Sequence, residues 1–142
     1  MARLDGSCLC GKVTYSCDAE PVATAVCHCT DCQKQTGTAF SIIVGVPRDA
    51  LQVEGDSLAT FTTVGTDTGK DVARQFCREC GSPIMSIAEA MPQLVFIKAG
   101  TLEDTSWLDP QMHVWSDSAQ PWVPLDGQAG PKLPRGPQLQ DA

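Results

Sequence analysis

The stretches CLCG at Cys8–Gly11 and CRECG at Cys77–Gly81 hold four of the eight cysteines and decide how the fold closes. Each is a pair of cysteines followed directly by a glycine. Because glycine tolerates a positive φ, the chain can turn tightly after each pair and present both sulfurs to one point. Four thiolates around one ion form the closed site that is typical of structural zinc. We therefore predict a structural zinc that ties the start of the chain to its middle, held by Cys8, Cys10, Cys77 and Cys80.

The stretch CHCTDCQ at Cys27–Gln33 contains three further cysteines. If its first residues are extended, Cys27 and Cys29 share one face while His28 points to the opposite one. A turn through the next residues can then bring Cys32 back to the pair. Three sulfurs with an open fourth position are typical of a catalytic zinc. We therefore predict a second, catalytic zinc on Cys27, Cys29 and Cys32.

A closed structural site is the other interpretation of the same stretch. In that case His28, His113 or Asp31 would supply the fourth ligand. The remaining cysteine, Cys17, lies on an alternating stretch and is predicted to be a small buried apolar residue.

Composition and charge narrow the class of protein. The chain has 142 residues, of which 42% are hydrophobic and 19% charged, as in an ordinary globular domain. Its net charge of −7 argues against a nucleic-acid partner, which Lys and Arg would have to neutralise. No apolar run is long enough to cross a bilayer, and the first residues lack the apolar stretch of a signal peptide. We expect a cytoplasmic protein without a membrane or nucleic-acid partner, in which closely spaced thiols bind zinc rather than form disulfides or an iron–sulfur cluster.

Short stretches rich in β-branched and aromatic residues predict strands, with turn-forming residues between them. The predicted strands span residues 12–17, 39–46, 58–64, 71–77, 83–87 and 94–100. Single helical turns are predicted at 31–36 and 105–108. The predicted class is mainly β, a single domain of short antiparallel strands over residues 1–125. A Pro- and Gly-rich tail, extended or mobile, is predicted at 126–142.

The order of these motifs resembles the glutathione-dependent formaldehyde-activating (GFA) enzyme and centromere protein V-like family. The matching stretches are GSCLCG at 6–11, CHCTDC at 27–32 with QKQTGTAF after it, FCRECGSP at 76–83 and the later DPQMHVWSDSAQPW at 109–122. The likeness extends from about Gly6 to Trp122. It implies the zinc-binding Mss4-like fold, with the same division into a structural zinc on the first four cysteines and a catalytic zinc on Cys27, Cys29 and Cys32.

The resemblance also implies an activity, namely that of a carbon–sulfur lyase. The default reaction condenses glutathione with formaldehyde to S-hydroxymethylglutathione, and lyase reactions on related thioethers are the wider class. The segments expected to shape the pocket are 36–40, 65–70 and 113–115. Because the Mss4-like fold also serves protein partners, a zinc-stabilised binding module without catalysis is the alternative function.

Sulfur chemistry independently favours a thiol substrate. Three thiolates give a zinc site a net negative charge, and such a site lowers the pKa of bound water only weakly. A thiol bound to the same zinc, by contrast, is deprotonated outright. An alkoxide formed from an aldehyde would need a proton donor, for which the candidates by residue type are His113, His28 and Asp31. Glutathione is anionic and would need local cations, for which the pool is Lys34, Arg48, Arg74, Arg78 and Lys98.

Overall fold

The computed structural model describes residues 3–127 and 130–136. Within these residues the chain is mainly β, with one α-helix and three short 3-10 turns. The strands are β1 (Leu4–Ser7), β2 (Thr14–Cys17), β3 (Ala23–Cys27), β4 (Ser41–Pro47), β5 (Leu51–Glu54), β6 (Leu58–Val64), β7 (Asp71–Cys77), β8 (Pro83–Ala88), β9 (Leu94–Lys98) and β10 (Met112–Val114). The helix is α1 (Thr30–Thr36), and the 3-10 turns are η1 (Arg48–Ala50), η2 (Ala99–Thr101) and η3 (Ser116–Ser118).

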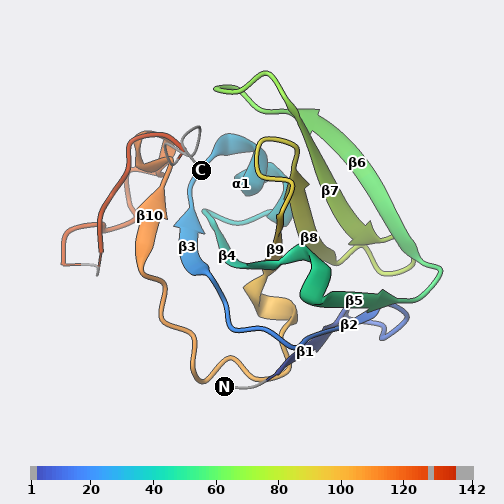
Figure 1. Ribbon diagram of the computed structural model, residues 1–142. Coiled ribbons are helices and arrows are strands. Elements are labelled where there is room, and N and C mark those ends of the chain that lie inside the picture. The colour runs from blue at the N-terminus through green and yellow to red at the C-terminus, as the bar shows by residue number, and fades with distance from the viewer. Residues whose placement is uncertain (1–2, 128–129, 137–142) are drawn as a thin grey trace.

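The strands form two sheets. The larger has the order β10-β3-β4-β9-β8-β7-β6, and the smaller has the order β1-β2-β5. All neighbours pair antiparallel except β10, which lies parallel to β3. Figure 1 shows the large sheet extending from β10 on the left to β6 on the right, with α1 above and between its two ends. The predicted mainly β, single-domain class is confirmed, and the parallel pairing of β10 is an addition to it.

The main core lies between the two sheets. Branched apolar side chains of β4, β8 and β9 are fully buried there, including Val44, Ile84 and Ile97. They pack against the smaller sheet, whose Cys17 is only 1% exposed. The prediction that Cys17 is a buried apolar residue is therefore confirmed.

The helix α1 begins directly after β3 and has a well-defined start and end. Cys29 is its N-cap, and the Sγ of Cys29 accepts a hydrogen bond from the backbone N–H of Cys32 at 3.2 Å. Gly37 ends the helix with a left-handed φ of 68°, which costs a glycine little. The second predicted helical turn is instead a hydrogen-bonded turn, in which the N–H of Leu108 donates to the carbonyl of Thr105.

The segment 130–136 lies beside β10. Leu133 donates its N–H to the carbonyl of His113 at 2.8 Å, and Leu133 packs against a small apolar cluster around Cys27 and Cys32. The guanidinium of Arg135 lies 4.6 Å from the centre of the Trp115 ring. The predicted tail at 126–142 also includes residues 128–129 and 137–142, which lie outside the described residues.

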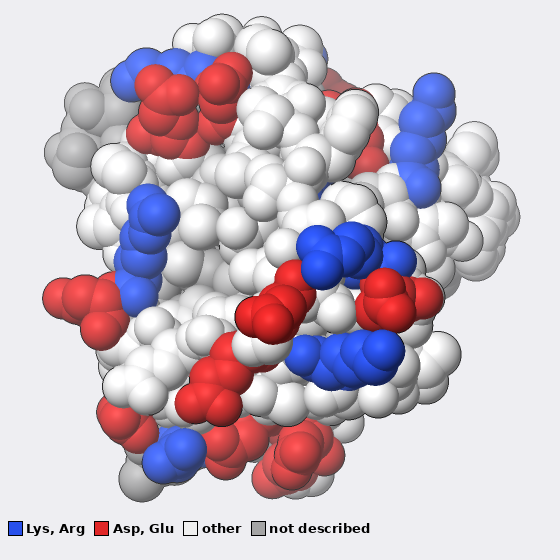
Figure 2. Space-filling model, turned by 90° about the vertical axis from the view of Figure 1, so that its right-hand side faces the viewer, with Lys and Arg blue, Asp and Glu red and all other residues white. Residues whose placement is uncertain are grey.

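No helix in the described part of the chain is long and apolar enough to span a membrane. Figure 2 shows the right-hand side of the molecule, where acidic and basic side chains lie interspersed around a central area without charged side chains. That face carries no large patch of a single sign.

Two candidate metal centres

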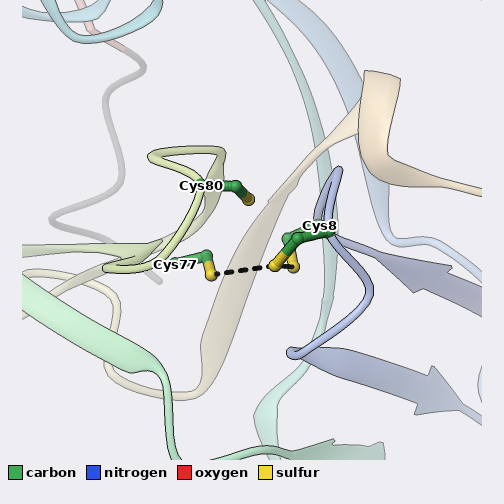
Figure 3. A group of neighbouring side chains, drawn as sticks. Cys8, Cys77 and Cys80 are labelled. Carbon is green, nitrogen blue, oxygen red and sulfur yellow. Dashed lines mark hydrogen bonds between the residues drawn. The ribbon is translucent and has the colours of Figure 1, made fainter.

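The first cluster joins the turn after β1 to the turn after β7. The Sγ atoms of its four cysteines, Cys8, Cys10, Cys77 and Cys80, all lie within 4.8 Å of one another. The Sγ of Cys10 is 3.6 Å from that of Cys8 and 3.8 Å from that of Cys77. A tetrahedral zinc with bonds of about 2.3 Å would separate its sulfurs by about 3.8 Å. Figure 3 shows Cys77 and Cys80 pointing from one turn toward Cys8 on the other.

Two glycines shape these turns, as the sequence predicts. Gly11 and Gly81 both have a φ of 81°, in the left-handed region that a side chain rarely adopts. The N–H of Gly81 donates to the carbonyl of Cys77 at 2.7 Å, which closes the second turn. Hydrogen bonds from the hydroxyl and the N–H of Ser82 lower the pKa of the Cys80 thiol to about 5. The separations of the four sulfurs, close to those of tetrahedral coordination, therefore fit one zinc ion.

The second cluster lies where β3 passes into α1. The Sγ atoms of Cys27, Cys29 and Cys32 lie within 4.8 Å of one another, and those of Cys27 and Cys32 are 3.5 Å apart. All eight cysteines are free thiols. The spacing of these three sulfurs also fits one zinc ion, because it is close to the separation that tetrahedral coordination requires.

The residues that were considered as a fourth ligand lie elsewhere. Among the described residues, no His, Asp or Glu has a ligand atom within 4.8 Å of all three sulfurs. His28 is fully buried on the other side of the chain, where its Nε2 lies 2.9 Å from the Nδ1 of His113. The rings of these two histidines stack with an interplanar angle of 17°. Asp31 faces outward and its carboxylate lies 3.9 Å from the Nη2 of Arg74.

Arg74 of β7 holds a positive charge against the three-cysteine cluster. Its side chain is buried, and its Nη1 lies 3.8 Å from the Sγ of Cys32. The same Nη1 donates to the Oε1 of Gln35 at 3.1 Å, and Nε donates to the Oγ1 of Thr63 at 2.9 Å. Contacts from α1 and β6 thus fix the guanidinium, which is charged at every physiological pH.

Lys98 at the end of β9 is a second buried cation near the same cluster. Its Nζ donates to the Oγ of Ser41 at 3.0 Å. Ser41 is the cross-strand partner of Cys27 in the β3–β4 register. Burial lowers the pKa of Lys98, while the neighbouring Cys32 thiolate opposes that shift. A buried ammonium is costly unless anions lie close to it, so this lysine fits a cluster of thiolates.

The same surroundings favour the charged form of Cys32. Hydrogen bonds with Cys27 and Cys29 lower its pKa most, and the charges of Lys98 and Arg74 lower it further.

The sequence placed Arg74 and Lys98 in a pool of five cations without choosing between them. The structure brings these two to the three-cysteine cluster and leaves Arg48 and Arg78 exposed elsewhere. Ser41 was not predicted at all. A lysine at the end of the otherwise apolar strand LVFIK was the available signal, because a charge in a buried strand usually has a partner.

Comparisons with known proteins agree on one family. A family model described as glutathione-dependent formaldehyde-activating enzyme matches residues 3–118. A protein of Podospora anserina is 34% identical over 97 residues, covering 65% of this chain and 43% of its own length. One of Aspergillus flavus is 29% identical over 111 residues, covering 73% of this chain and 56% of its own. Both carry, provisionally, the same name as the family, and this chain spans about half the length of these relatives.

A crystal structure of a Rhodobacter sphaeroides protein is similar in fold. It matches with a TM-score of 0.56 and 21% sequence identity, over 90% of this chain and 98% of the other. At this identity the match shows the shared fold alone.

Proposed function

Since this chain belongs to the glutathione-dependent formaldehyde-activating enzyme family, we propose that it is a zinc-dependent carbon–sulfur lyase acting on thiol–aldehyde adducts. Glutathione and formaldehyde, which the relatives' names give, are the proposed reference substrates, with S-hydroxymethylglutathione as the product. The observation that carries the proposal is the three-cysteine cluster. Its sulfurs have no fourth protein ligand among the described residues and lie beside two buried cations.

Two zinc ions per chain are part of the proposal. The structural ion would be held by Cys8, Cys10, Cys77 and Cys80, and the catalytic ion by Cys27, Cys29 and Cys32. When bound, the catalytic zinc would supply a coordination position at which a thiol loses its proton.

Arg74 and Lys98 would offset the negative charge that a fourth thiolate brings to this cluster. Four thiolates would exceed the charge of one zinc ion by two negative charges. The guanidinium of Arg74 and the ammonium of Lys98 offset that excess at short range. A neutral water in the same place would leave a positive excess instead, so these two residues favour an anionic sulfur over water.

The bond-forming step follows from that arrangement. The substrate thiolate sulfur adds to the aldehyde carbon, a C–S bond forms, and the carbonyl electron pair moves to oxygen. The oxygen then takes up one proton, and the reverse sequence releases aldehyde and thiol. The candidates for moving this proton are still Asp31, His113 and His28; Asp31 is the exposed one, next to Arg74, and as a carboxylate it would have to pick up the proton from solvent before passing it on.

The free thiols also bear on location. Cysteines that bind zinc as thiolates must be kept reduced, so we place the protein in the cytoplasm.

A cobalt-substituted protein tests the proposal. Glutathione should strengthen the sulfur-to-cobalt charge-transfer bands, and S-methylglutathione, which cannot ionise at sulfur, should leave them unchanged. Only glutathione should form the formaldehyde adduct faster than in buffer. If no thiol alters spectrum or rate, the catalytic proposal is wrong, and a zinc-stabilised binding module is the better account.

A further inference from the structure

A cavity of about 540 Å³ lies between α1 and the β6–β7 hairpin. This volume is within the range of small-molecule sites. A second hollow, of about 260 Å³, lies on the smaller sheet, away from Arg74. The larger cavity is lined by residues of α1, β6, β7, the turn after β7 and the start of β8, namely Asp31, Lys34, Gln35, Phe61, Thr63, Arg74, Phe76, Gly81 and Pro83.

The walls of this cavity are mainly apolar. Phe61 and Phe76 come from the paired strands β6 and β7, and Pro83 starts β8. Phe61 is 66% exposed, although burial of an aromatic ring is worth a few kcal/mol. An isolated exposed aromatic residue would carry no meaning. Here two rings and a proline line one hollow, which is the pattern of a ligand pocket.

The cavity reaches the three-cysteine cluster through Arg74. This residue lines the cavity, and its Nη1 lies 3.8 Å from the Sγ of Cys32. Asp31, which also lines the cavity, directly precedes Cys32 on α1. A molecule in this cavity would therefore meet the guanidinium of Arg74, which lies between the cavity and the cluster, because none of the three cysteines lines the cavity itself.

The charges of the lining select the sign of the ligand. Arg74 is paired with Asp31 at 3.9 Å and also faces Cys32, so Lys34 is the positive charge of the lining that remains for a ligand. A ligand with a negative charge fits this lining. The apolar walls favour a ligand whose body is less polar than the peptide backbone of glutathione.

We propose that this cavity binds the body of the thiol substrate and selects anionic thiols that carry an aromatic group. The inference rests on the proposed function, because it takes the cluster of Cys27, Cys29 and Cys32 as the place where the sulfur binds. Phe61 and Phe76 are then specificity-determining residues, and Lys34 is the cation at the rim that a carboxylate meets.

A pair of matched thiols tests this selection on the full-length cobalt-substituted protein. Thiolactate and its phenyl-substituted analogue share the thiol and the carboxylate and differ by one ring. Titration of the charge-transfer bands gives a Kd for each. We expect the phenyl analogue to bind at least about tenfold more tightly, a factor that corresponds to about 1.4 kcal/mol.

Two variants of the same strand make the test specific. F61A should remove most of the preference for the phenyl analogue, and the charge-transfer bands of the variant without added thiol show whether its cluster is intact. V64A is the control, because Val64 is 60% exposed on β6 and does not line the cavity. V64A should retain the full preference.

The outcomes separate the two proposals. If both thiols bind wild-type protein equally, or if F61A keeps the preference, the cavity is not the selective site and the proposed function still stands. If neither thiol nor glutathione changes the spectrum, both proposals fail together.

Discussion

The Nη1 of Arg74 lies 3.8 Å from the Sγ of Cys32, with the guanidinium fixed from α1 and β6 by Gln35 and Thr63. The positive charge of the Arg74 guanidinium is thus fixed beside the thiol of Cys32. At about 4 Å and with an effective dielectric constant of about 20, two unit charges interact by about 4 kcal/mol. This distance makes Arg74 the first residue to change when the charge of the cluster is tested.

R74Q should weaken the binding of a thiol to the cobalt-substituted protein by at least about tenfold. The guanidinium offsets the charge of the fourth thiolate, and one tenfold step corresponds to about 1.4 kcal/mol. Titration of the charge-transfer bands with glutathione measures the change. R74K, which keeps the charge, should recover part of the affinity, and R48Q, at an exposed arginine on η1, should behave as wild type. Equal weakening by R48Q would show a general charge effect and contradict the role of Arg74.

Purified protein should contain close to two zinc ions per chain, because the described residues form a four-sulfur and a three-sulfur cluster. A chelator should remove one ion while the protein stays folded, and the second only together with unfolding, since structural zinc binding contributes directly to folding. Metal analysis and circular dichroism during chelation measure both. Fully folded protein without any zinc would overturn the metal assignment.

C77S and C29S should have different consequences. Cys77 is fully buried and belongs to the cluster that joins the turn after β1 to the turn after β7, so C77S should lower the free energy of unfolding by several kcal/mol or prevent soluble expression. C29S should leave a folded protein that has lost one zinc ion. Thermal unfolding and metal content of the two variants are the measurements. Equal loss of folding in both would indicate that the three-cysteine cluster is structural.

The free energy of unfolding should fall as the pH is lowered below about 6.5. Burial holds the pKa of His28 and that of His113 below their usual 6.5. Between the folded-state and unfolded-state values, the unfolded chain binds more protons, so acid favours unfolding in that window and the loss is complete below the folded-state pKa.

H113N isolates this contribution. Protonation of the thiolates acts alike in the variant and in wild type, so the difference between their pH profiles belongs to the histidine pair. Urea unfolding between pH 7.5 and 5 should show a shallower slope for H113N, by up to about 1.4 kcal/mol per pH unit. Parallel profiles would mean that the pair does not titrate on unfolding.

Local spacing was enough to predict both cysteine clusters and the larger strands. Residues 58–64 and 71–77 are strands with the predicted bounds, because their pattern and the intervening turn residues are local signals. The glycine turns after Cys10 and Cys80 follow from a property of glycine alone. That Cys27 and Cys29 share a face opposite His28 follows from the pleat of an extended chain.

Pairings between distant segments were not predictable in the same way. β10 has three residues and its partner β3 lies far away in the sequence, so neither its existence nor its parallel direction leaves a periodic signal. The same holds for Arg74 and Lys98, which reach the cluster only because β7 and β9 belong to one sheet with β3. The contact between His28 and His113 likewise depends on that parallel pair.

The two clusters differ in when they can assemble as the chain leaves the ribosome. Cys27 and Cys32 are five positions apart, whereas Cys10 and Cys77 are 67 positions apart. The longer loop costs about 2 kcal/mol more in closure entropy, and it cannot close before Cys77 has been synthesised. The three-sulfur cluster can therefore bind an ion on a nascent chain in which Cys8 and Cys10 are present but Cys77 and Cys80 have not yet been made. Zinc supply during synthesis would then act first on the proposed catalytic site, and the four-cysteine site that joins distant parts of the chain would form later.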